Sequence, residues 1–310
     1  MAITPAMIKE LRERTSAGMS DCKNALVEAE GDLDKAVDVI LKKGLVKAAS
    51  RAGKVATEGE VATWVSPDGK KGVIVEVNCQ TDFVSRGDDF KGFVKNVLDV
   101  ASKLPKGKDL AAEMYPGSDK TIDHVRQDMV GRIGENIVVR RWDVLDATGP
   151  NGFVTSYVHM GGKLAVLIGA EGHDAQSKTH ADVKAFVENC AMQIAAMSPI
   201  VVHKDHVAAA DIAKQKEIFE AQLKEEGKPE ASFPKIIEGK LNKWFTEVTL
   251  LGQDNVWEQG AGTVDKIRGE LAKKVGGEVA ITEFIRFGLG EGIEKKVENL
   301  AEEVAKTMGV

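Results

Sequence analysis

One eleven-residue stretch shows the sharpest change of pattern in this chain: Glu76-Val77-Asn78-Cys79-Gln80-Thr81-Asp82-Phe83-Val84-Ser85-Arg86. Its beginning continues an alternation of valine with other residues from position 73, which is typical of a half-buried β-strand. Polar residues then end the strand, and a carboxylate, Asp82, stands directly before an aromatic ring, Phe83. Either Phe83 packs inward while Asp82 caps the next helix, or the two side chains form a probe that inserts into a partner.

An internal repeat with a constant spacing of 93 residues surrounds this stretch. The identical pairs are Gly59/Gly152, Val61/Val154, Val65/Val158, Gly69/Gly162, Lys70/Lys163, Lys91/Lys184, Phe93/Phe186, Val94/Val187 and Asn96/Asn189. One spacing that serves two separate blocks indicates a duplicated core, in which each copy is a hairpin followed by a helix. The predicted elements are strands at 61–65 and 73–77, a helix at 89–103, strands at 153–158 and 164–170, and a helix at 180–197.

The repeat helps to choose between the two interpretations of the stretch. At the same spacing, Asp82 and Phe83 correspond to Ala175 and Gln176. Two copies of one scaffold must form similar cores. An acid and an aromatic ring that only one copy carries therefore favour a functional role over a structural one. We therefore expect Asp82 and Phe83 to act on a partner.

The N-terminal region predicts three short helices within residues 1–44. Their expected N-caps are Thr4, Ser20 and Asp32, and Gly31 and Gly44 are expected to end the second and third helices.

Two features of this region are candidates for contact with a partner. Met19 lies in a predicted turn, where its flexible, polarisable side chain suits a binding surface, although incidental exposure explains it as well. Residues 42–54 hold five basic residues and no acid. They predict a solvated linker or, alternatively, a segment that docks onto an acidic protein surface.

The remaining elements complete the two copies of the core and add an insertion. They are a helix at 122–133, a strand at 137–145, a projecting antiparallel hairpin of helices at 205–226 and 232–246, strands at 248–251 and 279–287, and a final helix carrying Ile293, Val297, Leu300, Ala301 and Val304.

Together these elements predict an α+β fold with antiparallel sheets. Its expected parts are an N-terminal three-helix domain with a basic linker (1–54), core subdomain N (55–147), core subdomain C (148–204 and 248–288), an inserted helical hairpin (205–247) and a C-terminal module (289–310).

Composition limits the classes of function that are open to the chain. Among 310 residues, 29% are charged, and no apolar run approaches the ~20 residues that span a bilayer. The net charge of −6 argues against direct nucleic-acid binding, which needs a basic face. Three scattered cysteines and an N-terminus without a signal-peptide pattern favour a cytoplasmic protein.

No motif for a chemical reaction is found. The sequence lacks the phosphate loop G-x-x-x-x-G-K-[ST], the nucleophile motif G-x-S-x-G and the zinc motif H-E-x-x-H. His203, Asp205 and His206 imitate a metal site, but a solvated helix cap explains them better. We therefore predict no catalytic residue, no metal site and no cofactor, and a binding protein rather than an enzyme.

Two segments resemble signatures of the bacterial translation elongation factor Ts family. They are the stretch 76–86 and Leu11-Arg12-Glu13-Arg14-Thr15-Ser16-Ala17-Gly18-Met19-Ser20-Asp21-Cys22-Lys23-Asn24-Ala25-Leu26. Residues 281–296 resemble the C-terminal end of the family, whereas residues 254–262 depart from its pattern. The resemblance covers essentially the whole chain, and it implies a UBA-like N-terminal bundle and a coiled-coil insertion.

The resemblance implies a guanine-nucleotide exchange factor for the GTPase elongation factor Tu. In the family, the tip that corresponds to Thr81-Asp82-Phe83-Val84 enters the partner near its Mg²⁺ site. Phe83 would wedge between two partner helices, and Asp82 would disturb the groups that hold the ion. Because Mg²⁺ neutralises the nucleotide phosphates, its displacement loosens GDP.

The resemblance also assigns residues outside the tip. Arg12 and Met19 would grip the nucleotide-binding domain together with the last helix, and His159 would lie near the partner's phosphate loop. The sequence leaves open whether the protein forms a homodimer or a dimer of heterodimers.

A protein-binding adaptor is the alternative from a different class. Small helical bundles with an exposed residue such as Met19 bind other proteins without promoting nucleotide exchange. Deletion of residues 1–54 separates the two, because an adaptor would lose all activity whereas an exchange factor would keep some through Phe83.

Overall fold

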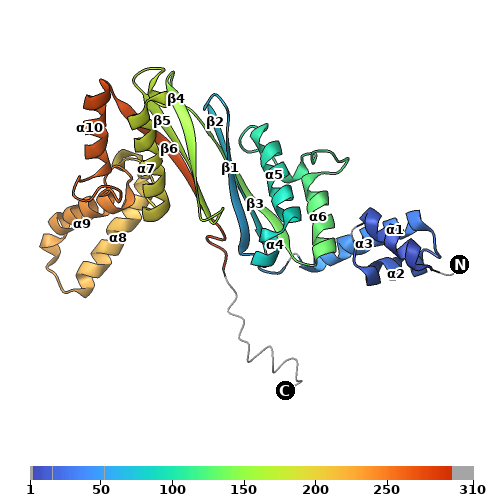
Figure 1. Cartoon of the computed structure of the whole chain (residues 1–310). Coiled ribbons are helices and arrows are strands. Elements are labelled where there is room, and N and C mark those ends of the chain that lie inside the picture. The colour runs from blue at the N-terminus through green and yellow to red at the C-terminus, as the bar shows by residue number, and fades with distance from the viewer. Residues whose placement is uncertain (1–2, 16, 52, 295–310) are drawn as a thin grey trace. The chain divides into compact units, whose positions relative to one another are not determined.

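The protein has an α+β fold with two antiparallel three-stranded sheets, ordered β1-β2-β3 and β4-β5-β6 (Figure 1). This computed structural model describes residues 3–15, 17–51 and 53–294. The strands are β1 (Glu58–Val65), β2 (Lys71–Cys79), β3 (Ile137–Asp146), β4 (Gly152–His159), β5 (Leu164–Gly172) and β6 (Val279–Gly288).

The helices lie N-terminal to the sheets, between their strands and in one insertion. They are α1 (Pro5–Thr15), α2 (Met19–Glu28), α3 (Leu33–Arg51), α4 (Asp82–Arg86), α5 (Asp88–Ser102), α6 (Ile122–Ile133), α7 (Ala181–Met197), α8 (Ala209–Glu225), α9 (Phe233–Val248) and α10 (Val264–Val275), with the 3-10 turns η1 (Leu110–Ala112), η2 (Ser177–Thr179), η3 (Lys204–His206) and η4 (Glu230–Ser232).

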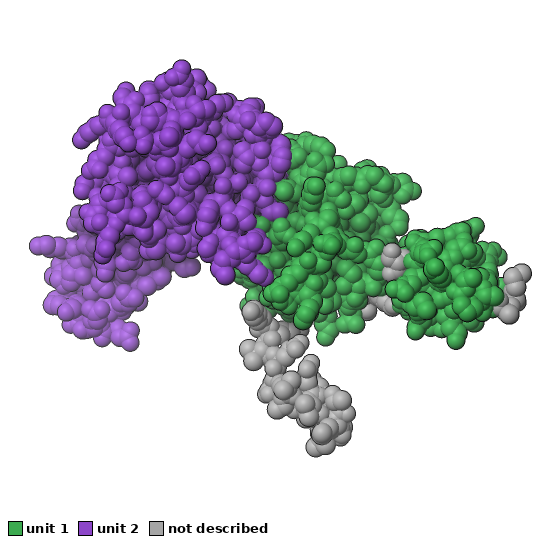
Figure 2. Space-filling model, viewed as in Figure 1, with its two compact units in different colours: residues 1–61, 75–141, 288–310 green, residues 62–74, 142–287 purple. Residues whose placement is uncertain are grey.

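The chain divides into two compact units, which Figure 2 shows in different colours. Unit 1 consists of Met1–Val61, Val75–Arg141 and Gly288–Val310. Unit 2 consists of Ala62–Ile74 and Trp142–Phe287. Each unit is therefore assembled from segments that are distant in the sequence.

The N-terminal bundle has a core of its own, formed by the buried residues Leu11, Ala17, Cys22, Ala25, Leu26, Ala29 and Ala36. The predicted caps of its first and third helices are confirmed. The hydroxyl of Thr4 accepts the Met7 N–H at 3.3 Å, and the carboxylate of Asp32 accepts the N–H groups of Asp34 and Lys35 at 3.0 Å each.

Two predictions for this bundle are wrong. Ser20 does not cap α2, because the helix already begins at Met19 with Gly18 as its N-cap; Met19 therefore lies in the first helical turn and not in a loop. Nor does Gly44 end α3, which continues to Arg51 through much of the predicted linker. Gly44 lies against Gly131 of α6, and this close packing outweighs the low helix propensity of glycine.

The expected elements of the first copy are confirmed. β1 and β2 form a hairpin whose turn is closed by the Ser66 N–H, which donates to the Lys71 carbonyl at 2.8 Å. Figure 1 shows α5 and α6 beside the sheet. The side of α5 that faces inward carries Phe90, Phe93, Val94, Val97 and Ala101. This helix follows the eleven-residue stretch directly, so its burial fixes the far end of that stretch.

The second copy has the same plan, with one helix that the sequence analysis missed. β4 and β5 pair antiparallel from Gly152 opposite Glu171 to His159 opposite Leu164. Helices α7 and α10 share a core with this sheet. The missed helix is α10, and the strand predicted at 248–251 is wrong: α9 continues to Val248, and Thr249 forms only an isolated bridge with Val201.

The duplication continues beyond the blocks that the spacing of 93 reveals. After the inserted hairpin, α10 and β6 repeat α6 and β3 at a spacing of 142 residues, so that Thr121-Ile122-Asp123 corresponds to Thr263-Val264-Asp265. In both copies threonine caps the helix and a glycine with positive φ ends it, Gly134 at 84° and Gly276 at 80°. Each copy is therefore a hairpin, a helix, a second helix and a third strand.

The inserted hairpin is confirmed as two packed helices, α8 and α9. They bury Leu223, Phe233, Ile237 and Leu241, with Ile212, Phe219, Ile236, Trp244 and Phe245 partly buried around them. The first helix begins at Ala209 and not at 205, where a 3-10 turn precedes it. The predicted last helix, with Val297, Leu300, Ala301 and Val304, lies outside the described residues.

Candidate functional site

The polar end of the stretch 76–86 forms a short helical tip, defined here as Thr81-Asp82-Phe83-Val84. β2 ends at Cys79 and α4 begins at Asp82, with Thr81 as its N-cap. Asp82 therefore does not cap the helix. Its carboxylate instead forms an ion pair with Arg86 one turn later, at 2.9 Å.

Among the large apolar side chains whose burial the structure describes, which leaves out residues 45–50, Phe83 is the most exposed, with 84% of its surface accessible. The interpretation in which it packs inward is wrong. The chain can hold it outward because its neighbours are anchored: Ser85 is buried, and its hydroxyl donates to the Asp82 carbonyl at 3.0 Å. The tip is thus an ordered helix that presents an apolar ring to solvent.

The base of the tip is held by the corner between α6 and β3. The Glu135 carboxylate accepts the Thr81 N–H at 3.1 Å and the Thr81 hydroxyl at 2.8 Å. The Asn136 N–H donates to the Gln80 side-chain oxygen at 2.8 Å. The sequence analysis missed Glu135 and Asn136, although a polar pair between a helix-ending glycine and a buried strand was a usable signal.

A buried carboxylate, Glu76, lies in the strand that carries the tip. It accepts hydrogen bonds from Arg140 at 2.9 Å, from Arg141, from Asn78 at 3.1 Å and from the Gly290 N–H at 2.8 Å. Burial raises the pKa of Glu76, but these hydrogen bonds outweigh it and hold the pKa below the ordinary value.

The same arginines bind the last residue of β6 and the segment that follows it. The Arg141 guanidinium donates to the Gly288 carbonyl at 3.0 Å, and Arg140 donates to the Glu291 carbonyl. Glu76 thus joins β2, β3 and the chain around Gly290 within unit 1.

The other predicted partner-binding residues are exposed and belong to other elements of the chain. Arg12 on α1 and Met19 at the start of α2 belong to the N-terminal bundle, and 57% of Met19 is accessible. His159 ends β4 in unit 2, and its ring accepts from or donates to the Tyr157 hydroxyl at 2.9 Å. The four tip residues are consecutive and lie together at the start of α4 in unit 1.

Comparison with known proteins decides the family. The model of the protein family described as Elongation factor TS matches residues 80–291. The curated Elongation factor Ts of Clostridium perfringens strain SM101 is 45% identical over 311 residues, covering 99% of each chain. Those of a Nitratiruptor species and of Nautilia profundicola are 45% and 44% identical, over 99% of this chain and 100% and 99% of theirs. The chain belongs to the elongation factor Ts family.

The part that matches the Elongation factor TS model includes the tip, Glu135 and His159. It begins after Arg12 and Met19, which are covered only by the full-length relatives.

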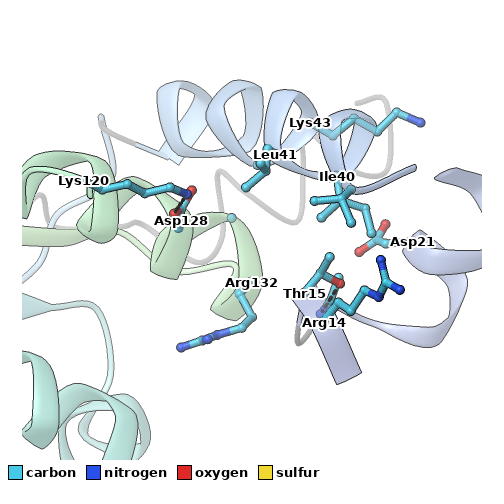
Figure 3. Close-up of a pocket in the computed structure, with 13 residues that line it drawn as sticks. Arg14, Thr15, Asp21, Ile40, Leu41, Lys43, Lys120, Asp128 and Arg132 are labelled. Atoms are coloured by element: carbon cyan, nitrogen blue, oxygen red, sulfur yellow. Dashed lines mark hydrogen bonds and ion pairs between the residues drawn. The ribbon is translucent and has the colours of Figure 1, made fainter. Parts of the chain in front are cut away.

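A pocket of about 310 Å³ lies between the N-terminal bundle and α6 (Figure 3). Its basic side chains are already paired with acids: Arg14 with Glu10 and Asp34, Lys43 with Glu28, Lys120 with Asp128, and Arg132 with Asp89.

The structure also bears on metal and membrane binding. Within residues 3–15, 17–51 and 53–294 there is no group of three or more His, Cys, Asp or Glu that could hold a metal ion. His203 caps η3 by accepting the Asp205 N–H, as expected of a helix cap. In the same ranges, no helix combines the length and apolar character needed to cross a membrane.

Proposed function

We propose that this member of the elongation factor Ts family is a guanine-nucleotide exchange factor for elongation factor Tu. The observation that carries the proposal is the tip, in which Phe83 is 84% exposed on a helix anchored at both ends. An exposed ring on an anchored backbone is suited to insertion, because burial of the ring stabilises a complex by roughly 2 kcal/mol.

The mechanism follows from the chemistry of the tip. Phe83 inserts between partner helices near the nucleotide, and the Asp82 carboxylate disturbs the groups that hold the partner's Mg²⁺. Loss of the ion leaves the phosphate charges less neutralised, so GDP leaves. No step makes or breaks a covalent bond, and the protein acts through binding alone.

Contacts outside the tip complete the proposed interface. Arg12 and Met19 are exposed on the N-terminal bundle and would grip the nucleotide-binding domain. His159 is exposed beside Met160, in a turn where Met160, Gly161 and Gly162 all have positive φ. This turn would approach the phosphate loop. We place the protein in the cytoplasm, without direct contact to nucleic acid or membrane.

Release of a fluorescent GDP analogue from elongation factor Tu tests the proposal. The wild-type protein should accelerate release strongly, and Phe83→Ala should lose most of the acceleration. Met114→Ala is the matched control, since it also removes an exposed apolar side chain, 54% accessible. Equal acceleration by wild type and Phe83→Ala would move the cause of exchange away from the tip, and no acceleration by either would refute the function.

A non-catalytic adaptor is the second candidate, favoured by the exposure of Arg12 and Met19 on a bundle with its own core. The double variant Arg12→Ala, Met19→Ala should abolish partner capture by an adaptor. An exchange factor that also uses its tip should retain residual binding and acceleration.

A further inference from the structure

Glu135 holds the base of the tip although it lies 54 residues away in the sequence. Its two carboxylate oxygens each accept one donor of Thr81: Oε2 the backbone N–H at 3.1 Å, and Oε1 the hydroxyl at 2.8 Å. Hydrogen bonds to a charged acceptor are roughly twice as strong as neutral ones. Both the backbone and the side-chain rotamer of Thr81 are therefore fixed.

The carbonyl oxygen of Thr81 is held as well. It accepts the Ser85 N–H at 3.3 Å and the Cys79 thiol at 3.2 Å. Every polar group of Thr81 thus has a partner, two residues before Phe83. Thr81 is also the N-cap of α4, and its hydroxyl accepts the Val84 N–H at 3.5 Å.

The corner that carries Glu135 is itself well fixed. Gly134 ends α6 with φ 84°, a conformation that glycine adopts without strain, and β3 begins at Ile137. Between them, Asn136 donates from its N–H to Gln80 and from its side chain to the Lys54 carbonyl, at 2.8 Å each. Glu135 is therefore presented to Thr81 from a rigid support.

The second copy of the core provides an internal comparison. Thr81 and Glu135 correspond to Asp174 and Gly277, at the spacings of 93 and 142 residues. Gly277 has no side chain, and a Cβ there would lie 2.2 Å from the ring of His173. The same scaffold thus forms its corner without a carboxylate at this position. The copy that lacks the exposed ring also lacks the residue that holds the ring's support.

We infer that Glu135 is a positioning residue for nucleotide exchange, which holds Thr81 so that Phe83 is presented in one direction. The inference rests on the proposed function. A side chain that is already held in its docking direction loses less conformational freedom on binding, and this preorganisation favours association.

The first test uses the protein alone and needs no partner. In wild type, the Thr81 amide should exchange slowly with solvent deuterium, as measured by NMR, because its N–H is bonded to Glu135. Glu135→Ala should remove this protection, and Glu135→Gln, which keeps one acceptor oxygen, should retain part of it. Glu278→Ala is the control: this carboxylate lies at the corresponding corner of the second copy and is 85% exposed. Unchanged protection in Glu135→Ala would overturn the inference.

The second test measures GDP release from elongation factor Tu with the same variants in wild-type and Phe83→Ala backgrounds. Loss of the contact should slow release about tenfold in the wild-type background, the factor expected from a charged hydrogen bond. In the Phe83→Ala background, loss of the contact should change the rate of GDP release little, because Glu135 acts through the ring of Phe83. An equal loss in both backgrounds would overturn positioning through the tip, as would an unchanged rate. Failure of the wild type to accelerate release would instead refute the proposed function.

Discussion

At the scale of single residues, Phe83 combines an apolar ring with almost complete exposure. We predict that Phe83→Ala leaves the stability of the isolated protein unchanged within about 0.5 kcal/mol, as for surface substitutions, while it impairs exchange. The midpoint of thermal unfolding measures the first effect. A loss of several kcal/mol would show that the ring packs into the protein, and would contradict its assignment to a partner surface.

Glu76 should make the stability of unit 1 dependent on pH. Its side chain is fully buried, and its pKa in the folded protein lies below the ordinary value of 4.5. The contribution of Glu76 to stability is therefore complete above the pKa that it has in the unfolded chain. This contribution is lost as the pH falls through the lower pKa that it has in the folded protein. Removal of one partner from a buried ion pair costs about 3 kcal/mol. Glu76→Gln should show this loss already at pH 7, in urea unfolding.

The pH dependence supplies the control for this prediction. Between pH 5 and pH 3, roughly the range in which glutamate titrates, the wild type should lose more stability than Glu76→Gln, because the variant has no carboxylate to protonate. Glu258→Gln, at an exposed position, should follow the wild type. Parallel curves for wild type and Glu76→Gln would show that Glu76 does not contribute through its charge.

At the scale of helices, α3 and α6 approach so closely that two glycines meet. A Cβ at Gly131 would lie 2.6 Å from the Gly44 Cα. We therefore predict that Gly131→Ala forces the helices apart and lowers stability by about 1–3 kcal/mol, as overpacking does. Gly92→Ala on α5 is the matched control, because nothing lies within 4 Å of its new Cβ. That change should stabilise by about 0.5–1 kcal/mol, since alanine is the better helix former. Thermal unfolding of both variants measures the two changes in stability, which should have opposite signs.

The inserted hairpin should behave as a locally cooperative element. Leu223 is buried in its small core, so Leu223→Ala should destabilise α8 and α9 by about 3 kcal/mol. Amide hydrogen exchange should rise throughout α8 and α9 and stay unchanged in β4 and β5. Ile218→Ala, at an exposed position of the same helix, should alter neither. Faster exchange in the sheet as well would show that the hairpin and the core open together.

At the scale of the whole molecule, the proposed exchange cycle requires reciprocal coupling. If the protein weakens the binding of GDP to elongation factor Tu by a given factor, GDP must weaken the binding of the protein by the same factor. Titration of the complex with GDP, monitored by dissociation of this protein, measures how much GDP weakens the binding of the protein. Measurement of GDP binding with and without the protein gives the factor by which the protein weakens the binding of GDP. Binding of the protein that does not respond to GDP would contradict exchange and favour the adaptor.

Several features of the site were accessible to sequence analysis because they are local. The alternation before Asn78 predicts the strand, and the absence of Asp82 and Phe83 from the second copy indicates their special role. Asp82 and Thr81 are both good N-cap residues, and the structure uses Thr81, so the alternative interpretation in which Asp82 caps the helix is wrong. The polar pair Glu135 and Asn136 is visible in the sequence, but its contact with Thr81 is not, because the two segments are 54 residues apart.

The sequence by itself determined the duplicated plan, the helical insertion and most element boundaries, because periodicity, turn residues and a constant spacing of 93 residues can be read from it directly. The family was indicated by the resemblance of residues 11–26 and 76–86 to its signatures. The tertiary structure alone decided that α3 continues past Gly44, that Phe83 points outward and that Glu76 and Glu135 hold their strand and tip. In each case the outcome depends on a contact between segments far apart in the chain: a glycine against a glycine, or a carboxylate with donors from other strands. Such contacts exist only once the segments have folded against each other.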